Sequence, residues 1–353
     1  MKIVKTAQSR LKGVDFEHLS FGDIFSDHML SAEYRGRKWE EATIIPYGPM
    51  EINPAMCSLH YGQIIFDGLK AFCGRKGSIY LFRPQKYHER MNQSCKRLCI
   101  PDVERDVFLN GLKELITLDR EWVPKKQWYS LYIRPFIFAT DDFLGVKVSE
   151  TYRFLIITGP VGAYYKEGIN PVRLTTPEGY VRASRGGLGA AKTPANYAAT
   201  LLPAEVANKK GFTQVLWLDG VEGKYVDEVG TMNLFFLIGD ELITPPLEGT
   251  ILPGVTRDSV IHLAADWKIK VSERKVSIDE VFAASKKGKL KEVFGSGTAA
   301  VISPVGEIHH GGQKIVVNDN KIGSLAQKLY DEITGIQYGE KPDKFGWRYT
   351  VCT

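Results

Sequence analysis

RGGLGAAKTPANY, residues 185–197, places a single charged amine, Lys192, in a run of glycine and alanine directly before a Thr-Pro step. Three interpretations account for such a lysine. It belongs to a phosphate-binding loop, it is a solvated lysine on a flexible surface loop, or it is an amine that reacts with a bulky partner. The loop alone does not decide among them, so the rest of the chain has to.

The phosphate-binding loop is the nearest known motif, and it is incomplete here. That motif needs glycine, four residues, glycine, lysine and then serine or threonine, between a buried strand and a helix. Gly186, Lys192 and Thr193 fit, but Ala191 occupies the second glycine position, where a Cβ resists the required backbone. The preceding residues 176–184 are polar and turn-rich. A nucleotide-binding kinase therefore remains an alternative with only a partial motif.

The neighbours of Lys192 bear on the other two interpretations. Most lysines are exposed, and a solvated lysine is the simplest explanation of a glycine-rich loop. Here the flanking residues are small and apolar rather than charged. Such neighbours leave room for a bulky partner, and partial desolvation lowers the pKa of an amine from its usual value of about 10.4.

Length and composition limit the class of protein. A chain of 353 residues is long for one core and predicts two domains. The net charge of +5 is spread along the chain, which argues against a basic nucleic-acid-binding protein. The N-terminal residues lack the apolar segment of a signal peptide, and the longest apolar runs are too short to span a bilayer. We therefore expect no nucleic-acid partner and no membrane association.

The five cysteines indicate a reducing compartment. An odd number in a large chain without an export signal is typical of a cytoplasmic protein, which is the location we expect. Cys95 and Cys99 lie four residues apart on an expected helix, without a Cys/His cluster nearby. Small core side chains explain this spacing better than metal ligands do, so no metal is expected.

The pattern of apolar residues predicts alternating strands and helices. Strands are expected at 78–83, 127–140, 151–160, 213–219, 224–229 and within 233–246, which is interrupted by a turn at Gly239-Asp240. Helices are expected at 84–101 and 195–211, and residues 251–267 are expected to form a tight turn that leads into a helix. The two strands at 127–140 and 151–160 are expected to pair. Residues 291–305 are expected to form one strand broken at the Gly-Ser-Gly kink, and the Gly- and Pro-rich residues 162–180 a hinge or linker.

Three further places could hold an anion. The turn before the helix at 251–267 would direct the backbone NH groups of Val255 and Thr256 outward at a positive helix end, although most helix starts bind only water. GSGT at 295–298 offers NH groups and the hydroxyl of Thr298, or is simply a β-bulge. Arg90 lies on the flank of a helical apolar stripe, where it either points inward or forms a surface salt bridge.

Glu228 lies between Val226 and Val229 in a strand-like run. A solvated acid on an edge strand is one interpretation, and a buried acid that meets a cation is the other. A reactive lysine, a phosphate-binding cup and a buried carboxylate together are what pyridoxal 5′-phosphate requires. The lysine forms the Schiff base, the cup binds the phosphate, and the acid keeps the ring nitrogen protonated. The chain is therefore expected to bind this cofactor.

Five segments together resemble the signature segments of branched-chain amino acid aminotransferases, which are fold-type IV pyridoxal-phosphate enzymes. They are LHYGQIIFDGLKAF, LYIRPF, EVGTMNLFF, ILPGVTRDSV and EVFGSGTA, and the similarity runs from about residue 20 to the C-terminus. The resemblance implies an α+β fold and a homodimer with its active site between the domains, near the dimer interface. It implies a small N-terminal α/β domain over residues 1–166, a linker over 167–180, and a larger cofactor-binding domain with a pseudo-barrel sheet over 181–353.

The same resemblance assigns roles to individual residues. Lys192 becomes the Schiff-base lysine and catalytic residue, and Glu228 the partner of the pyridine nitrogen. The other residues that it places around the cofactor are Arg90, Tyr197, Thr231, Val255, Thr256 and Thr298. Those that it places around the substrate are Phe21, Tyr61 (from the other subunit), Phe66, Tyr132, Arg134, Val146, Tyr164, Thr298 and Ala299. Arg134 matches the residue that receives the side-chain carboxylate of glutamate.

The function implied by the resemblance is transamination between L-leucine, L-isoleucine or L-valine and 2-oxoglutarate, which yields a branched-chain 2-oxo acid and L-glutamate. A D-amino-acid aminotransferase and an aminodeoxychorismate lyase share the lysine and the glutamate, but the YIRPF and GPVGAYY segments argue against both. Animal members carry a Cys-x-x-Cys pair where this chain has Ala300 and Ser303. A bacterial-type enzyme without that redox control is therefore expected.

Overall fold

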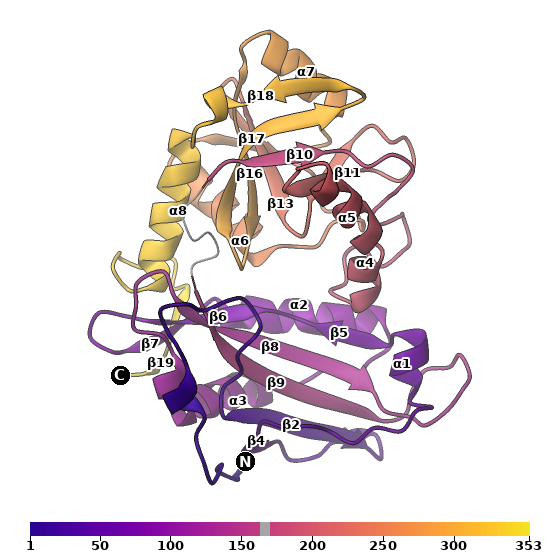
Figure 1. Cartoon of the computed structure of the whole chain (residues 1–353), viewed down its shortest axis with the longest axis vertical. Coiled ribbons are helices and arrows are strands. Elements are labelled where there is room, and N and C mark those ends of the chain that lie inside the picture. Colours follow the sequence, from indigo (N-terminus) through magenta and orange to yellow (C-terminus); the bar gives the residue numbers. More distant parts are fainter. Residues whose placement is uncertain (163–169) are drawn as a thin grey trace. The chain divides into compact units, whose positions relative to one another are not determined.

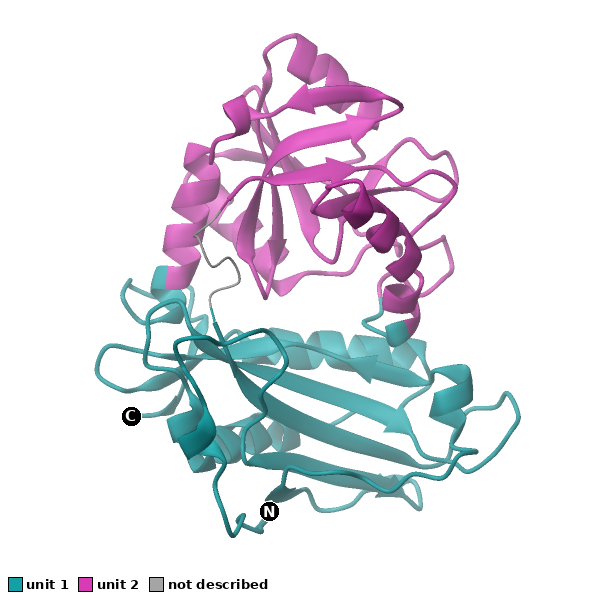
Figure 2. Ribbon diagram, viewed as in Figure 1, with its two compact units in different colours: residues 1–166, 191–194, 335–353 teal, residues 167–190, 195–334 magenta. Residues whose placement is uncertain are grey.

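The computed structural model describes residues 1–162 and 170–353, and the chain divides into two compact units, which we describe separately (Figures 1 and 2). Unit 1 consists of Met1–Lys166, Ala191–Pro194 and Gly335–Thr353. Unit 2 consists of Glu167–Ala190 and Ala195–Thr334. The chain thus returns to unit 1 twice, which the expected division at residues 167–180 did not include. Lys192 belongs to unit 1 and most of the residues around it in sequence to unit 2.

Unit 1 is built on one sheet, which contains ten strands among the residues described and has the order β1-β4-β2-β9-β8-β6-β7-β19 (Figure 1). In addition β3 pairs with β2, and β5 with β8. The strands are β1 (Lys2–Ile3), β2 (His28–Arg35), β3 (Lys38–Trp39), β4 (Thr43–Pro46), β5 (Ile64–Phe66), β6 (Leu69–Cys73), β7 (Ile79–Phe82), β8 (Ser130–Ala139), β9 (Tyr152–Val161) and β19 (Arg348–Cys352). The predicted pairing of β8 with β9 is confirmed along their full length.

The two faces of this sheet differ, and strand β8 shows how. Leu131, Ile133 and Ile137 are fully buried, whereas Tyr132 and Arg134 alternate with them and are only partly buried. Successive side chains of a strand point to opposite faces, so one face forms the core and the other carries polar and aromatic groups. The helical segments of this unit are η1 (Leu11–Gly13), α1 (Cys57–Tyr61), α2 (Pro84–Arg97), α3 (Arg105–Leu118) and η2 (Arg120–Trp122).

Helix α2 confirms the helix expected from residue 84. Proline occupies its first turn, where a missing NH costs nothing. Tyr87, Met91 and Cys95 are buried at helical spacing, and α2 contacts α3 and β5. Cys95 is therefore a core side chain, and the residues described contain no group of three or more His, Cys, Asp or Glu side chains that could hold a metal ion.

Unit 2 is built on a mixed sheet of nine strands in the part of the chain described, with the order β12-β11-β10-β17-β16-β13-β14-β15 and β18 beside β17. The strands are β10 (Val172–Thr175), β11 (Gln214–Leu218), β12 (Val226–Val229), β13 (Asn233–Ile238), β14 (Glu241–Thr244), β15 (Lys270–Glu273), β16 (Leu290–Gly297), β17 (Val301–His310) and β18 (Gln313–Val316). The helical segments are α4 (Pro194–Ala198), α5 (Leu201–Lys209), α6 (Val255–Asp266), α7 (Ile278–Lys286), η3 (Asn318–Asn320) and α8 (Ser324–Gln337), which leads back to unit 1.

The expected linker was wrong in its second half. Strand β10 lies within residues 167–180 and pairs in parallel with both β11 and β17. Val172 and Leu174 are buried and alternate with the polar residues Arg173 and Thr175. This is an ordinary strand pattern, but it is short and surrounded by turn-forming residues. No helix in the described ranges is long and apolar enough to span a membrane.

Two other expectations also need correction. The helix expected over 195–211 is two helices, because Pro203 has no NH to donate back to residue 199 and its ring crowds that carbonyl group. Strand β16 continues through Gly297, so the break lies after the glycines and not at them. A Cβ at Gly295 or Gly297 would lie 3.1 Å from the side chain of Met232, so these glycines permit close packing.

Candidate active site

The backbone of Lys192 is fixed to the core of unit 1. The amide of Phe66 donates to the carbonyl of Lys192 at 3.0 Å, and the amide of Lys192 donates to Ser94 Oγ at 2.9 Å. The next residue, Thr193, donates its hydroxyl to the carbonyl of Ile64 at 2.8 Å. The lysine is thereby held between β5 and α2, so the interpretation as a lysine on a flexible surface loop is wrong.

The amine of Lys192 lies in an environment that favours its neutral form. Its Nζ lies 5.0 Å from the centre of the Phe66 ring. The pKa of Lys192 is lowered to about 8, mainly by burial and in part by the nearby charge of Arg90, while Asp67 opposes both effects. With this pKa about a tenth of the amine is neutral at pH 7, far more than for an ordinary lysine, and the neutral amine is the form that attacks a carbonyl carbon.

Arg90 forms a buried ion pair with Asp67. Arg90 Nε lies 3.0 Å from Asp67 Oδ2, and Nη2 lies 2.5 Å from Oδ1. Arg90 is 6% exposed and Asp67 is fully buried, so the interpretation of Arg90 as part of a surface salt bridge is wrong. Sequence analysis missed Asp67, although an acid inside the apolar run IIFDGLKAF is the same signal that pointed to Glu228.

Aromatic rings surround a second arginine on β8. Arg134 Nη2 donates to the hydroxyl of Tyr132 at 2.9 Å, and the guanidinium carbon lies 4.7 Å from the centre of the Phe66 ring. Phe21 packs edge-on against Tyr132, with the ring centres 4.8 Å apart. A Cβ at Gly68 would collide with the Tyr132 hydroxyl, so glycine leaves the space that this hydroxyl occupies. The Nε of Arg134 is buried and has no hydrogen-bond partner among the residues described.

The remaining substrate residues expected in unit 1 lie in a different environment. Tyr61, at the end of α1, is 46% exposed, and Val146, in the loop between β8 and β9, is 88% exposed. A single copy of the chain leaves both open to solvent. Tyr164 lies outside the described residues. Lys70, which no motif singled out, is a further buried amine on β6, and burial lowers its pKa to about 8.

In unit 2 the carboxylate of Glu228 is buried and paired. Strand β12 is an edge strand, but Glu228 is only 2% exposed, so the interpretation as a solvated acid is wrong. Arg182 Nε lies 2.7 Å from Glu228 Oε2. Asn233 Nδ2 donates to Glu228 Oε1 at 3.0 Å and to the carbonyl of Leu252 at 2.9 Å. Arg182 and Asn233 were missed because Arg182 lies in a turn-rich segment and Asn233 at the start of an apolar strand.

Asn233 also connects Glu228 to the start of α6. A Cβ at Gly254, the residue before α6, would collide with Asn233 Oδ1. Glycine at this position therefore brings the first residues of the helix, Val255 and Thr256, close to the Glu228 pair. Both are buried, and the NH groups of the first turn of a helix are suited to binding an anion.

The other residues of unit 2 that were expected around the cofactor and the substrate come from two turns and a helix. Asn233 is also the register partner of Ser296 on β16, whose Oγ is buried without a hydrogen-bond partner among the residues described. Thr298 and Ala299 follow in the turn after β16 and are partly buried. Thr231 is exposed in the turn between β12 and β13, and Tyr197 is partly buried on α4.

The glycines around Lys192 have a packing role that the sequence did not reveal. A Cβ at Gly189 would collide with the backbone of Thr250, and the amide of Ala190 donates to the carbonyl of Gly249 at 3.1 Å. Gly186 has a φ of +74°, which disfavours a side chain. In unit 2 these small residues therefore permit close backbone packing, whereas the sequence suggested space for a bulky partner.

Comparison with known proteins places the chain in a family. The model of the family described as "Amino-transferase class IV" matches residues 65–308. The chain is 53% identical over 339 residues to "Branched-chain-amino-acid aminotransferase 2" of Bacillus subtilis (strain 168), covering 96% of this chain and 93% of that relative. The chain thus belongs to the class IV aminotransferases and, within them, to the family of branched-chain-amino-acid aminotransferases.

Solved structures have the same fold. The branched-chain aminotransferase from Thermoproteus uzoniensis with norvaline superposes with a TM-score of 0.76 at 25% identity, covering 92% of this chain and 99% of that chain. The branched-chain amino acid aminotransferase from Escherichia coli superposes with a TM-score of 0.74 at 27% identity, covering 92% and 99%. The expected α+β fold of type IV is therefore confirmed.

Class IV aminotransferases depend on pyridoxal 5′-phosphate, and so does this chain. Its residues fit the chemical groups of the cofactor. Lys192 has an amine of lowered pKa, the kind of group that would bind the carbonyl carbon, and Glu228 has a buried carboxylate, the kind of group that would pair with the ring nitrogen. The Oγ of Ser296, which has no hydrogen-bond partner among the residues described, and the NH groups that begin α6 are the kind of donors that would bind a phosphate.

Proposed function

We propose that this chain transfers the amino group of L-leucine, L-isoleucine or L-valine to 2-oxoglutarate, forming the branched-chain 2-oxo acid and L-glutamate. The reaction proceeds in two half-reactions that share Lys192, which binds the cofactor as a Schiff base. The name of the B. subtilis relative supports the class of amino acid. The observation that carries the proposal is the partly buried guanidinium of Arg134, which lies among aromatic rings and whose buried Nε has no hydrogen-bond partner among the residues described.

Arg134 explains how one pocket accepts two kinds of side chain. The rings of Phe66 and Tyr132 offer apolar surface that suits aliphatic side chains and disfavours a charge through desolvation. Glutamate and 2-oxoglutarate carry a second carboxylate, for which the planar guanidinium of Arg134 is a suitable bidentate partner. The hydrogen bond to Tyr132 keeps the guanidinium in place when an aliphatic substrate is bound.

The proposed roles of the other residues follow from their environment. When bound, the cofactor supplies a carbonyl group and an electron-withdrawing ring that stabilises negative charge at the substrate Cα. Lys192 binds the cofactor and moves the proton at that carbon, since its neutral amine is a base at physiological pH. Glu228 and Tyr197 bind the ring nitrogen and the ring hydroxyl. Arg90, Thr231, Val255, Thr256 and Thr298 bind the phosphate and the ring edge, and Ala299 and Thr298 contact the substrate.

A homodimer is part of the proposal. The residues around α1 and the β8–β9 loop lie side by side, because Cys57 donates its amide to the carbonyl of Asp141 at 2.9 Å. Large apolar side chains are exposed on both segments: Met50, Ile52, Leu59, Tyr61, Phe143, Leu144, Val146 and Val148. A surface of this kind is typical of a protein interface, and a second copy would cover Tyr61 and Val146. The five free thiols are consistent with the proposed cytoplasmic location.

The proposal is tested by locating the lysine that carries the cofactor. Borohydride reduction of the purified holoenzyme, followed by peptide mapping, should label Lys192 and no other lysine, and Lys192→Ala should show no label and no turnover. Lys70 is a built-in control because it is also a buried amine with a pKa of about 8. A label on Lys70, or transfer from D-leucine but not L-leucine to 2-oxoglutarate, would overturn the assignment.

A further inference from the structure

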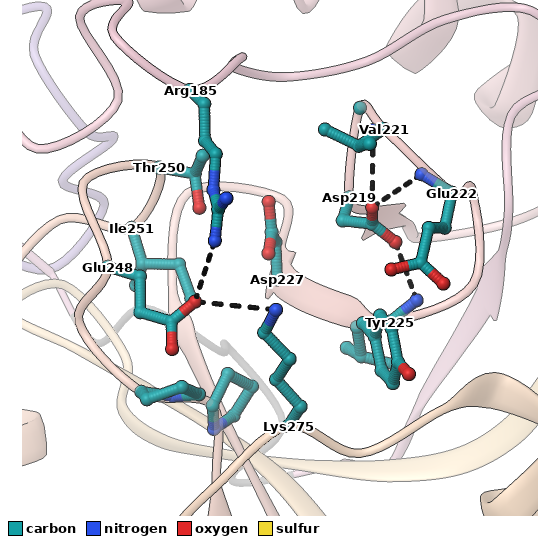
Figure 3. Close-up of a pocket in the computed structure, with 14 residues that line it drawn as sticks. Arg185, Asp219, Val221, Glu222, Tyr225, Asp227, Glu248, Thr250, Ile251 and Lys275 are labelled. Carbon is teal, nitrogen blue, oxygen red and sulfur yellow. Dashed lines mark hydrogen bonds and ion pairs between the residues drawn. The ribbon is translucent and has the colours of Figure 1, made fainter.

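A second buried acid, Asp227, precedes Glu228 on strand β12. It is 8% exposed and lines a pocket of unit 2 whose other charged side chains are Arg185, Asp219, Glu222, Glu248 and Lys275 (Figure 3). In this pocket Arg185 and Lys275 both pair with Glu248, at 3.7 and 3.5 Å. Strand β12 therefore carries a buried acid on each side: Asp227 faces this pocket, and the adjacent Glu228 points away from it.

Arg182 connects the two acids. Its Nε lies 2.7 Å from Glu228 Oε2, and its Nη1 donates to the carbonyl of Thr250 at 2.8 Å. The side chain of Thr250 in turn hydrogen-bonds to Asp227. Arg182 is 8% exposed, so its position depends on these partners. One guanidinium thus binds Glu228 on one side and is anchored through Thr250 on the other.

The two neighbouring acids differ in how they meet a cation: Glu228 pairs directly with Arg182, whereas Asp227 is linked to Arg182 through Thr250. The pKa of Asp227 is raised to about 6 by burial, whose effect the hydrogen bond from Thr250 and the charges of Arg182 and Lys275 offset only in part. Glu228 is more deeply buried than Asp227, so desolvation disfavours its charged form at least as strongly. Its direct contact with a guanidinium, which stays protonated in proteins, favours the charged form.

We propose that Arg182 is a positioning residue of the reaction, which keeps the carboxylate of Glu228 charged and fixed in direction. Thr250 and Asp227 hold Arg182 in place from the pocket side. The inference rests on the proposed role of Glu228 toward the ring nitrogen, because a protonated Glu228 would offer that nitrogen no negative charge. It adds a residue from the turn-rich segment 176–184, which contributes no other residue to the proposed site.

The first arm of the test measures the stability of the full chain after removal of the cofactor. Arg182→Gln leaves the Glu228 charge buried without its cation, so the apparent melting temperature should fall by roughly 5 °C or more. Adding Glu228→Gln removes that charge, so the double variant should melt above Arg182→Gln alone. Arg185→Gln is the matched control: its side chain is 69% exposed, and its loss should change the melting temperature by at most a degree or two.

The second arm uses the holoenzyme and has readouts other than turnover. Arg182→Gln should raise the dissociation constant of pyridoxal 5′-phosphate at least tenfold and change the pH dependence of its visible absorbance. In a Glu228→Gln background the same substitution should add less than a twofold effect, because the carboxylate that it serves is gone. Arg182→Lys keeps a cation without the fork of donors and should restore part of the affinity.

The outcomes separate this inference from the proposed function. Equal effects of Arg182→Gln in both Glu228 backgrounds, in stability and in cofactor affinity, would overturn the positioning role while leaving the transaminase intact. A wild-type chain that binds no cofactor would overturn the proposed function, and with it any role of Arg182 toward the ring. Non-additive effects in both arms, with Arg185→Gln close to wild type, would support the positioning role.

Discussion

The guanidinium of Arg134 donates to the hydroxyl of Tyr132 at 2.9 Å, and the two residues are next-nearest neighbours on one face of strand β8. The partner is supplied by the same strand, so the arginine does not need a substrate carboxylate to stay in place. Residues i and i+2 of a strand share a face, and the short segment YIR thereby produces a cation with a built-in hydrogen-bond acceptor.

We expect Arg134→Gln to affect the two halves of the reaction unequally. The loss for glutamate and 2-oxoglutarate should be roughly 2–5 kcal/mol in kcat/KM, the usual cost of leaving a buried charge without its partner. Leucine and its 2-oxo acid should lose far less, because they present only an aliphatic side chain. Single-turnover kinetics with each amino acid alone, followed through the colour of the cofactor, measure the two losses separately.

Tyr132→Phe is the matched control for this prediction. It keeps the ring that packs against Phe21 and removes only the hydroxyl that accepts from Arg134. We expect a milder but similarly selective loss for glutamate. Equal losses for leucine and glutamate in Arg134→Gln would mean that Arg134 maintains the shape of the pocket and does not recognise the second carboxylate.

Glu228→Gln should lower kcat on the order of a hundredfold or more, as does the loss of one preorganised electrostatic partner in other enzymes. Glutamine keeps the shape and the acceptor for Asn233 but not the charge. Glu228→Asp, which keeps the charge, should retain more activity than Glu228→Gln. Steady-state kinetics at saturating substrate measure kcat for both variants and for wild type. A near-normal kcat in Glu228→Gln would show that the acid has only a structural role.

Lys192 should show its lowered pKa in two ways. The apoprotein should react with pyridoxal 5′-phosphate about tenfold more slowly for each pH unit below 8, since only the neutral amine attacks a carbonyl. Between the folded pKa of about 8 and the ordinary value of 10.5, the unfolded chain binds a proton that the folded chain does not. This lysine therefore makes stability rise with pH across that window, by up to about 3 kcal/mol.

Denaturant titrations of Lys192→Ala and wild type at pH 8 and pH 10 test the second effect. The pKa of Lys70 is lowered to the same value, so Lys70 makes stability depend on pH over the same range in both proteins. Only the difference in the free energy of unfolding between wild type and variant therefore reports on Lys192. The wild type should gain more stability than the variant over this range. Parallel curves for the two proteins would show that the Lys192 amine is solvated.

Asp227→Asn should stabilise the chain at neutral pH. The pKa of Asp227 is raised from 3.8 to about 6 by burial, so between these values the folded state holds a proton that the unfolded state lacks. The free energy of unfolding therefore falls as the pH rises between these two values. The variant does not lose this stability, because asparagine does not ionise. We expect a gain of about 2–3 kcal/mol at pH 8 that disappears at pH 4, measured by denaturant unfolding.

Asparagine keeps an oxygen that can accept the hydroxyl of Thr250, so this substitution should not disturb Arg182. A variant that is less stable than wild type at pH 8 would contradict the prediction. It would mean that the charge of Asp227 stabilises the pocket through Arg182 and Lys275 more than its burial costs.

Local patterns were sufficient for much of the fold and for part of the site. Tyr87, Met91 and Cys95 recur at helical spacing and form the buried stripe of α2, and the alternation in β8 and β9 predicted their pairing. Glu228 stood out because an acid inside an apolar run is unusual, and of the two interpretations that the pattern left open, the buried acid is the one found. These signals depend only on residues within one or two turns or along one strand.

The sequence-based predictions were wrong where contacts with residues far away along the chain determine the local structure. Strand β10 is too short to be recognised without β11 and β17 beside it. The glycines of residues 295–297 suggested a kink, but they make room for Met232 from another segment. In both cases the contact that explains the residue lies far away along the chain.

The pairs that set the charges of the site could come only from the folded chain. The motifs alone pointed to Lys192, Arg90 and Glu228, because a lone amine among small residues, an inward arginine and an acid among valines are unusual in their local context. Their partners Asp67 and Arg182 were invisible, since an ion pair is defined by distance in space. The electrostatic energy of such a pair depends on a separation of a few ångströms and on burial, and neither quantity is encoded within one stretch of sequence.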